Sequence, residues 1–250
     1  MKFYIFSSGS KGNATLIVDK SVHILIDLGI SQKKLCKHLD ELNLTLADID
    51  FILLTHEHID HIRGLENLEN IEIYGGKNTY KCDRYHVIEP YTPLKYKHLE
   101  ILPIETSHDA YNPLGFIFKN GKEKLVYITD TGFISEKNIC LAKNANYYIL
   151  ESNHDRKMLL KTARPKFVKD RIMSEFGHLS NEDSALYLSE MIGDKTSQVV
   201  LAHVSMEANT YDLPKIVCCN FLKKKKIDIA KIKIIVAKQY EECEGGSNED

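Results

Sequence analysis

Hydrophobic residues along the chain form short runs of strand length, and many of these runs end in polar residues. Runs of roughly four to eight apolar residues bounded by turn signals are typical of buried strands. Such runs occur at 49–54, on both sides of Thr106–Pro113, and in the segments HILID, KLVYITD, NYYILES, VVLAH and IDIAKIKIIV. Two more β-type runs flank Ser7–Asn13, whose glycines and asparagine suit a hairpin turn. The pattern predicts a protein rich in strands.

Two segments instead have the spacing of helices. The first helix would begin after Ser31, and the second after Ser180, which Asp183 follows at the spacing of a capping box. Leucines fall on one face of the first helix at spacings of four and three, at Leu35, Leu39 and Leu42. Residues 80–98, which contain two prolines, are expected to form an irregular surface segment at the rim of a site.

Length and composition favour one domain with a sizeable core. The chain has 250 residues, of which 43% are hydrophobic. We expect a single domain over residues 1–240 and a disordered acidic tail over 241–250. The six cysteines lack C-x-x-C spacing, which indicates reduced thiols and a cytoplasmic location. No apolar run approaches the roughly 20 residues that span a bilayer, so we expect no membrane partner.

The formal net charge of −2 gives no overall attraction to nucleic acid. One local exception is the stretch Arg156–Arg171, in which basic residues far outnumber acidic ones. The run Lys223–Lys226 is interpreted as a solvated helix end. Oligomeric state does not follow from these features.

The segment THEHIDH, residues 55–61, carries the strongest chemical signal in the chain. Residues two apart on an extended chain point the same way, so His56 and His58 can converge on one metal ion. The following turn directs Asp60 and His61 toward a neighbouring point. The spacing differs from the H-E-x-x-H pattern, because Asp60 stands where that pattern requires its second histidine. The segment therefore predicts two adjacent metal ions.

Further ligand-type residues follow other predicted strands, at His108, Asp130, His154 and His203. Loops at strand ends are held by a rigid scaffold, and sites on open sheets gather there. Five such endings in one chain indicate a single site.

The ordered phrases HEHIDH, SHDA, TDTG, GHLS and LAHVS resemble the metallo-β-lactamase-fold hydrolases over essentially the whole chain. The phrases SSGSKGN, LESNHD and LAHVSMEAN are most similar to the YycJ branch, also called WalJ or VicX. The resemblance implies an α+β fold, a four-layer αββα sandwich. It also implies that His56, His58 and His108 hold one metal and that Asp60, His61 and His203 hold the second, with Asp130 bridging. The ions would be Zn²⁺ or Mn²⁺.

Two adjacent ions can lower the pKa of a shared water and stabilise charge on phosphoryl oxygens during hydrolysis. Asp60 and His178 are the expected catalytic residues, and His178 would protonate the leaving oxygen. By resemblance, His178 corresponds to the histidine of the HLS or HST phrase in RNase Z and related phosphodiesterases. Ligand-holding carboxylates are expected among Glu57, Asp109 and Glu151. His154 would contact substrate or orient a ligand, and Asn181 is a further candidate for such a contact.

Three functions are compatible with the sequence. The YycJ resemblance implies a 5′-to-3′ exonuclease acting on DNA, and the basic stretch beside the site suits a polyanion. Too few residues separate Asp130 from His178 for the inserted domain of β-CASP nucleases, and the long arm of RNase Z is not recognisable. Long DNA is therefore expected to bind to the compact body. The alternatives are a small-molecule phosphodiesterase or thioester hydrolase, and a non-catalytic regulator linked to cell-wall signalling.

Overall fold

A computed structural model describes residues 1–66 and 68–247, which form two sheets of seven strands each. The strands of the first sheet, in spatial order, are β14 (Cys243–Gly246), β1 (Lys2–Ser7), β2 (Ala14–Asp19), β3 (Val22–Ile26), β4 (Phe51–Leu53), β5 (Glu72–Gly75) and β6 (Tyr85–Val87). Those of the second are β13 (Lys233–Val236), β12 (Gln198–Ala202), β11 (Tyr147–Glu151), β10 (Lys124–Ile128), β9 (Leu114–Lys119), β8 (Leu99–Glu105) and β7 (Leu94–Tyr96). Each sheet mixes parallel and antiparallel pairs.

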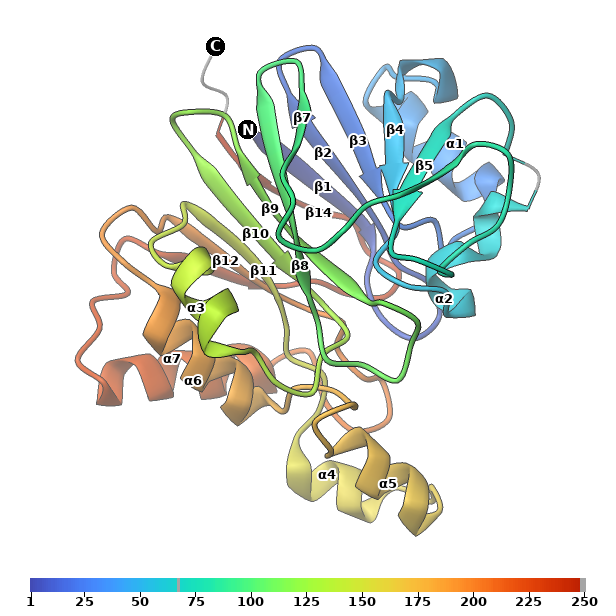
Figure 1. The fold of residues 1–250 in the computed structure, drawn as a ribbon. Coiled ribbons are helices and arrows are strands. Elements are labelled where there is room, and N and C mark those ends of the chain that lie inside the picture. Colours follow the sequence, from blue (N-terminus) through green and yellow to red (C-terminus); the bar gives the residue numbers. More distant parts are fainter. Residues whose placement is uncertain (67, 248–250) are drawn as a thin grey trace.

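The helices lie outside the two sheets, as Figure 1 shows. They are α1 (Gln32–Glu41), α2 (Ile59–Ile62), α3 (Glu136–Ala142), α4 (Arg156–Lys161), α5 (Lys166–Ile172), α6 (Asn181–Met191) and α7 (Leu213–Lys224). Helix α1 packs against the first sheet through Leu35 and Leu39. Helices α3, α6 and α7 cover the outer face of the second sheet. The predicted α+β fold with four αββα layers is confirmed.

The central strands are buried on both faces, which explains their continuous apolar runs. In β10, Leu125 and Tyr127 point into the core between the sheets, whereas Val126 and Ile128 pack beneath the outer helices. Side chains alternate between the two faces of a strand. One apolar run therefore contributes residues both to the core between the sheets and to the core beneath the outer helices.

Both sheets direct several strand ends to the same edge of the sandwich. Strands β3 and β4 are parallel neighbours, and so are β10, β11 and β12. Strand β8 runs parallel to β10, because both are antiparallel to β9. The carboxyl ends of all six strands therefore meet at one edge, where the predicted ligands follow them.

The two predicted helices are confirmed, together with their caps. The Ser31 hydroxyl accepts a hydrogen bond from the backbone of Lys34, and Ser180 forms a capping box with Asp183. The expectation that residues 80–98 are irregular was wrong for two short segments, which form β6 and β7. Both are three-residue strands at sheet edges and are not fully buried, so they lack the apolar signal of a core strand.

The expectation of a disordered tail was wrong for Cys243–Gly246, which forms β14 beside β1. The strand covers backbone groups that an edge strand would leave unpaired. The Gln198 amide also accepts a hydrogen bond from the backbone of Gly246 at 3.1 Å. A side chain at Gly245 would collide with the Phe3 ring, so glycine allows this close approach. Residues 248–250 of the predicted tail lie outside the described residues.

Helices α4 and α5 project below the body of the sandwich in Figure 1. They share a small apolar core formed by Leu159, Val168, Ile172 and Ala208. This pair contains the basic stretch noted in the sequence. The sequence did not predict these two helices, because the hydrophobic spacing within them is masked by many lysines and arginines. The expectation that long DNA binds to the compact body stays a prediction.

Candidate metal centre and active site

The THEHIDH segment begins where β4 ends and continues into α2. His58 is the residue at which α2 is capped, so the chain turns between His58 and His61. The His56 and His58 rings lie 4.5 Å apart between centroids. His108, which follows β8, lies 5.1 Å from His56 and 5.0 Å from His58 by the same measure. Nitrogen atoms of these three histidines lie close enough together to hold one ion.

Asp130 lies at the centre of the cluster. Its Oδ2 is 3.2 Å from His203 Nδ1 and 3.4 Å from His61 Nε2, and its Oδ1 is 3.9 Å from His108 Nε2. Burial raises the pKa of this carboxyl, but the surrounding imidazoles of His203, His61 and His56 outweigh burial and hold the pKa well below its usual range. Asp130 belongs to two of the groups whose donor atoms converge, one with His56 and His61 and one with Glu151, His178 and His203.

Several buried polar atoms in the cluster make no hydrogen bond to the residues that the structure describes. They are His56 Nε2, His203 Nδ1 and Asp130 Oδ2, of which the last two face each other at 3.2 Å without forming a hydrogen bond. An unpartnered buried polar atom is costly, so such atoms in a native protein require an explanation. Burial, together with the charge of His61, lowers the pKa of His56 well below its usual value, which leaves its lone pair free. Imidazole and carboxylate donors with open lone pairs fit a divalent metal ion.

Asp27 contacts His61 on the side of the ring that faces away from the cluster. The sequence analysis gave Asp27 no role in the site. Asp27 Oδ2 lies 2.8 Å from His61 Nδ1, and Asp27 also accepts hydrogen bonds from the backbone and hydroxyl of Thr55. Burial lowers the pKa of His61, but Asp27 and Asp130 outweigh it and raise the pKa to about 10. The Nε2 atom of His61 faces Asp60 Oδ2 at 3.6 Å. A carboxylate that orients a ligating histidine is usual in metal sites. The feature of the sequence that could have indicated this role is that Asp27 directly follows a buried strand.

Asn13 was interpreted only as a turn residue, yet its amide reaches the cluster. Its Nδ2 atom lies 3.0 Å from His61 Nε2 and 3.4 Å from Asp60 Oδ2. The backbone N–H of Asn13 also donates to the carbonyl of Asp60 at 2.8 Å. The β1–β2 loop therefore forms one wall of the site. Sequence spacing gives no signal for this contact, because it joins residues far apart in the chain.

His178, which is partly exposed, and the buried Glu151 form a pair beside Asp130. His178 Nδ1 lies 2.7 Å from Glu151 Oε1 and 3.7 Å from Asp130 Oδ1. The other oxygen of Glu151 accepts from the backbone of Thr131 and Leu179. Burial, followed by the charge of Asp130, raises the pKa of Glu151 to about 8, and burial lowers the pKa of His178. Glu151 thus fixes the orientation of the imidazole.

Three residues of the site have left-handed backbone conformations. The φ angles are 58° at Asp27, 52° at Asp130 and 52° at His203. Each residue lies at or just beyond the end of a central strand, β3, β10 or β12. Such conformations are uncommon outside glycine and cost of order 1–3 kcal/mol each. The chain reverses sharply at these points and directs the side chains into the cluster.

The remaining predicted residues lie around the cluster. Glu57 accepts hydrogen bonds from the backbone of Tyr111 and so braces the loop that carries His108. His154 is only 1% exposed, and burial together with the charge of His178 lowers its pKa to about 4. Asn181 is fully buried and hydrogen-bonded to Ser152 and Asn209. Asn181 therefore supports the strand ends and is not placed to touch a substrate.

Residues 23–204 match the family described as a beta-lactamase superfamily domain. The fold is similar to the metallo-beta-lactamase fold protein YhfI from Bacillus subtilis, with a TM-score of 0.69, 18% identity and coverage of 98% of this chain and 100% of that one. It is also similar to Zn²⁺-bound PqqB from Methylobacterium extorquens, with a TM-score of 0.67, 11% identity and coverage of 97% and 99%. The fold and the strand-end cluster together define a metal-dependent hydrolase of the metallo-β-lactamase superfamily.

Two relatives give a narrower assignment. Exodeoxyribonuclease YycJ of Bacillus anthracis is 32% identical over 244 residues, which cover 92% of each chain. Exodeoxyribonuclease WalJ of Streptococcus pneumoniae is 32% identical over 236 residues, which cover 88% of each chain. The chain belongs to the YycJ/WalJ family.

Within the part of the chain that the structure describes, no helix has both the length and the apolar character needed to cross a membrane. All six cysteines are free thiols.

Proposed function

We propose that the protein is a DNA exonuclease that removes nucleotides from the 5′ end with the help of two divalent ions, Zn²⁺ or Mn²⁺. The observation that carries this proposal is the strand-end cluster, in which convergent buried donors adjoin an oriented histidine that remains partly open to solvent. The relatives named exodeoxyribonuclease support DNA as the substrate. The free thiols support the predicted cytoplasmic location.

In this proposal His56, His58 and His108 hold one ion, and the convergence of their nitrogen atoms supports that assignment. Asp60, His61 and His203 hold the other, and Asp130 serves both. Glu151 also lies in the cluster, but its oxygens are engaged by His178 and by two backbone N–H groups. Glu151 is therefore assigned to hold His178. When bound, divalent ions lower the pKa of water and stabilise negative charge on phosphoryl oxygens.

His178 acts as the proton donor to the leaving oxygen. Its Nδ1 is committed to Glu151, so Nε2 is the atom left for the substrate. The side chain is 15% exposed, whereas the side chains of His61, His108 and His203 are at most 2% exposed. A substrate that reaches the cluster therefore meets His178, together with Asp60, whose side chain is 17% exposed. A histidine with one nitrogen fixed by a carboxylate is suited to pass a proton from the other.

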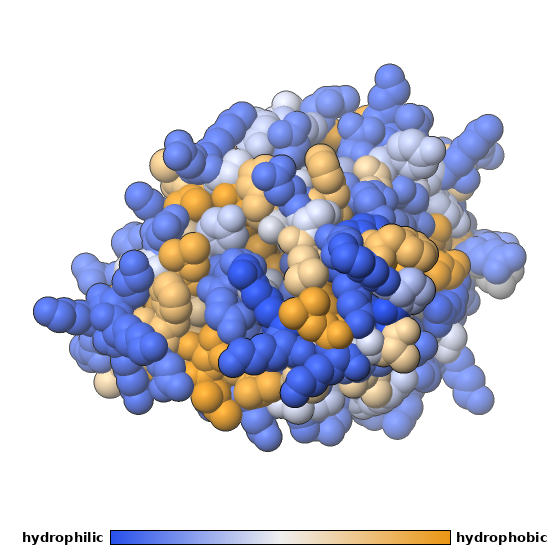
Figure 2. Space-filling model, turned by 90° about the horizontal axis from the view of Figure 1, so that it is seen from below, coloured by the Kyte–Doolittle hydropathy of each residue, from blue (hydrophilic) through white to orange (hydrophobic). Residues whose placement is uncertain are grey.

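Helices α4 and α5 provide basic side chains for the phosphate backbone. Arg156 and Arg171 are partly neutralised by Asp183 and Asp109. Lys157 and Lys161 are exposed on α4. This helix follows closely after β11, which ends at Glu151. Figure 2 shows the face seen from below, where hydrophilic and apolar side chains are interspersed. In this proposal the α4–α5 pair binds the part of the DNA strand that extends away from the metal centre.

The test is degradation of 5′-phosphorylated, end-labelled DNA by the metal-loaded protein over a series of salt concentrations. Stepwise shortening from the 5′ end, weakened by salt and lost in His178→Ala and Asp60→Ala, is the expected result. Cleavage of a small phosphodiester or a thioester with DNA left intact would assign the site to small molecules. Bound metal with no hydrolysis of either substrate would favour a regulator.

A further inference from the structure

A cavity of about 410 Å³ lies beside the metal centre, with His108 in its wall. Its volume is within the range of roughly 300–1,000 Å³ that is typical of small-ligand pockets, near the lower end. A nitrogen of His108 converges with nitrogens of His56 and His58, so a ligand in the cavity would lie next to the proposed ion site. The His178 ring is also near, with its centroid 5.0 Å from that of His108. The roles proposed above for the metal centre and the basic helices leave this space unused.

Hydrogen bonds between loops build the cavity wall. The backbone of Asp109 donates to the carbonyl of Phe176 at 3.2 Å, and that of Gly132 donates to the carbonyl of Ser107 at 2.8 Å. His108 Nδ1 also lies 3.0 Å from the carbonyl of Gly177. The loops after β8, β10 and α5 are thereby joined around His108. The cavity is consequently preformed, and its position relative to the cluster is fixed.

The lining combines flat apolar surfaces with a few polar groups. Tyr91, Phe133 and Phe176 line the cavity, and Phe133 and Phe176 are 39% and 58% exposed. Exposed aromatic rings around a concave site are a common mark of a binding surface. The polar lining residues include Lys77, Glu89, Glu105 and Ser107. Asn138 also lines the cavity, with its amide engaged by the Glu105 carbonyl and the Tyr91 hydroxyl. A flat, largely apolar ligand with hydrogen-bonding edges fits this lining.

We infer that the cavity binds the nucleobase of the terminal nucleotide while its phosphodiester lies at the metal centre. This inference rests on the proposed function. Bases stack on aromatic side chains irrespective of sequence, because every base has a π-face. A cavity of this size takes one nucleotide and not a longer run, so the residue that fits is the one at the end of the strand. The cavity would therefore accept the end nucleotide whatever its base.

The test compares two 5′-phosphorylated single strands that differ at the terminal position, where one has a normal nucleotide and the other an abasic tetrahydrofuran residue. For the wild type, kcat/KM of the first cleavage is expected to be roughly ten- to a hundredfold lower on the abasic strand, the value of one stacked base. Phe133→Ala and Phe176→Ala should lower the rate on the normal strand toward the abasic rate. Both variants should leave the abasic strand unaffected.

Phe167→Ala is the matched control. Phe167 is 74% exposed on α5 and does not line the cavity, so this variant should keep the wild-type ratio between the two strands. A terminal 2-aminopurine gives a second readout, because stacking quenches its fluorescence in the wild type and in Phe167→Ala but not in the double variant Phe133→Ala/Phe176→Ala. Equal cleavage of the two strands by the wild type, or an equal loss on both in Phe176→Ala, would overturn the inference alone. Failure to cut either strand would overturn the proposed function, and the inference with it.

Discussion

Asp130 shows how a single residue connects strand geometry to chemistry. It lies two positions beyond β10, in a left-handed conformation, and its carboxylate faces histidines that come from both sheets. Asp27 and His203 take similar conformations at the ends of β3 and β12. A native structure retains such strain only where its surroundings enforce it. The three strand ends therefore fix the cluster before any ion binds.

The His178–Glu151 pair gives the first prediction. His178→Ala should lower kcat on DNA by about 10²–10⁴-fold, the usual contribution of a proton donor. Glu151→Gln retains the shape of the side chain but has one oxygen in place of two, so it cannot accept both from His178 Nδ1 and from the backbone of Thr131 and Leu179. It should lower kcat by roughly 10–100-fold. Steady-state cleavage checks both values, with thermal unfolding as the control for folding. Unchanged kcat in Glu151→Gln would remove Glu151 from its positioning role.

Asp27 gives the second prediction. Asp27→Asn weakens the contact that orients His61, so metal affinity should fall by roughly 10–100-fold. Titration of the metal-free protein with Zn²⁺ or Mn²⁺, followed by calorimetry, measures the change. Asp40→Asn, at an exposed position on α1, is the control and should bind metal as the wild type does. Wild-type affinity in Asp27→Asn would contradict the role of Asp27.

At the residue level, the sequence indicated the side chains whose type and position after a strand are distinctive. The sequence analysis assigned His56, His58, His108, Asp130 and His203 to a single site. The structure places all five in one cluster. Their assignment to particular ions stays a prediction. Asn13 and Asp27 were missed because each has an ordinary role in its own segment and reaches the site only through tertiary packing.

The elements differ in how much of them the sequence could predict. Strands β10 and β12 have continuous apolar runs because both of their faces are buried, and both were predicted. Strands β6, β7 and β14 are short edge strands whose formation depends on pairing with a neighbour. Helix α7 has apolar residues and cysteines around most of its circumference and lysines mainly at its end, so its sequence lacks a clear helical period. Local pattern is informative where burial is complete and weak where pairing decides the structure.

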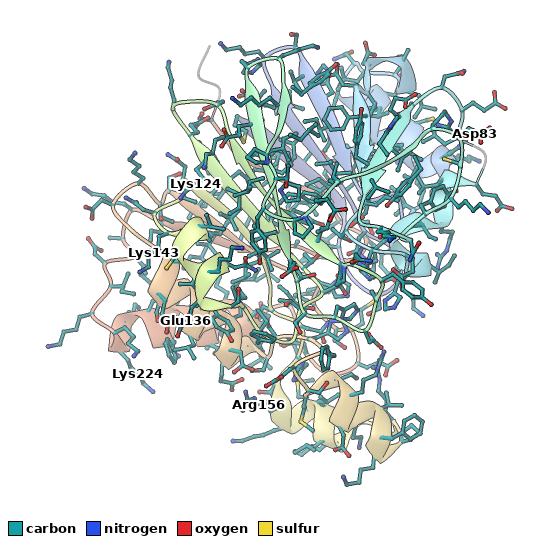
Figure 3. The ribbon with its side chains drawn as sticks, viewed as in Figure 1. Asp83, Lys124, Glu136, Lys143, Arg156 and Lys224 are labelled. Carbon is teal, nitrogen blue, oxygen red and sulfur yellow. The ribbon has the colours of Figure 1, made fainter. Side chains whose placement is uncertain are left out.

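The third prediction concerns the α4–α5 projection. Lys157→Glu combined with Lys161→Glu should weaken DNA binding. The slope of the logarithm of the DNA-binding constant against the logarithm of salt concentration should fall in magnitude by roughly one for each phosphate that a lysine no longer neutralises. The control is Lys223→Glu with Lys224→Glu at the end of α7. Figure 3 labels Arg156 at the start of α4 and Lys224 on α7, which are two separate helices. An equal effect of both pairs would indicate attraction by general charge and not a specific surface.

At the scale of the whole molecule, the cluster forms only if the two sheets keep their positions relative to each other. Asp50 helps to connect them, because it accepts a hydrogen bond from the backbone of His23 in β3 and another from the hydroxyl of Tyr96 in β7. Lys97 adds a contact at 3.0 Å. Burial raises the pKa of Asp50, but the hydrogen bonds from Tyr96, His23 and Lys97 outweigh it and lower the pKa below its usual value.

The fourth prediction follows from that lowered pKa. A carboxyl whose pKa is lower in the folded state stabilises the fold above its unfolded pKa of about 3.9, and this stabilisation is lost as the pH falls through the folded-state value. Asp50→Asn should reduce the free energy of unfolding at pH 7 by about 1–2 kcal/mol. The difference from the wild type should shrink below about pH 4. Urea unfolding at several pH values checks this, and a difference that does not depend on pH would contradict it.

The most direct test of the central claim is to titrate the metal-free protein with Mn²⁺ or Zn²⁺ while both bound metal and 5′-end degradation of DNA are measured. Degradation should be absent without metal and should reach its maximum when two ions are bound per chain. His178→Ala should bind the same amount of metal without restoring cleavage. Full degradation by the metal-free protein, or by His178→Ala at the wild-type rate, would contradict the account.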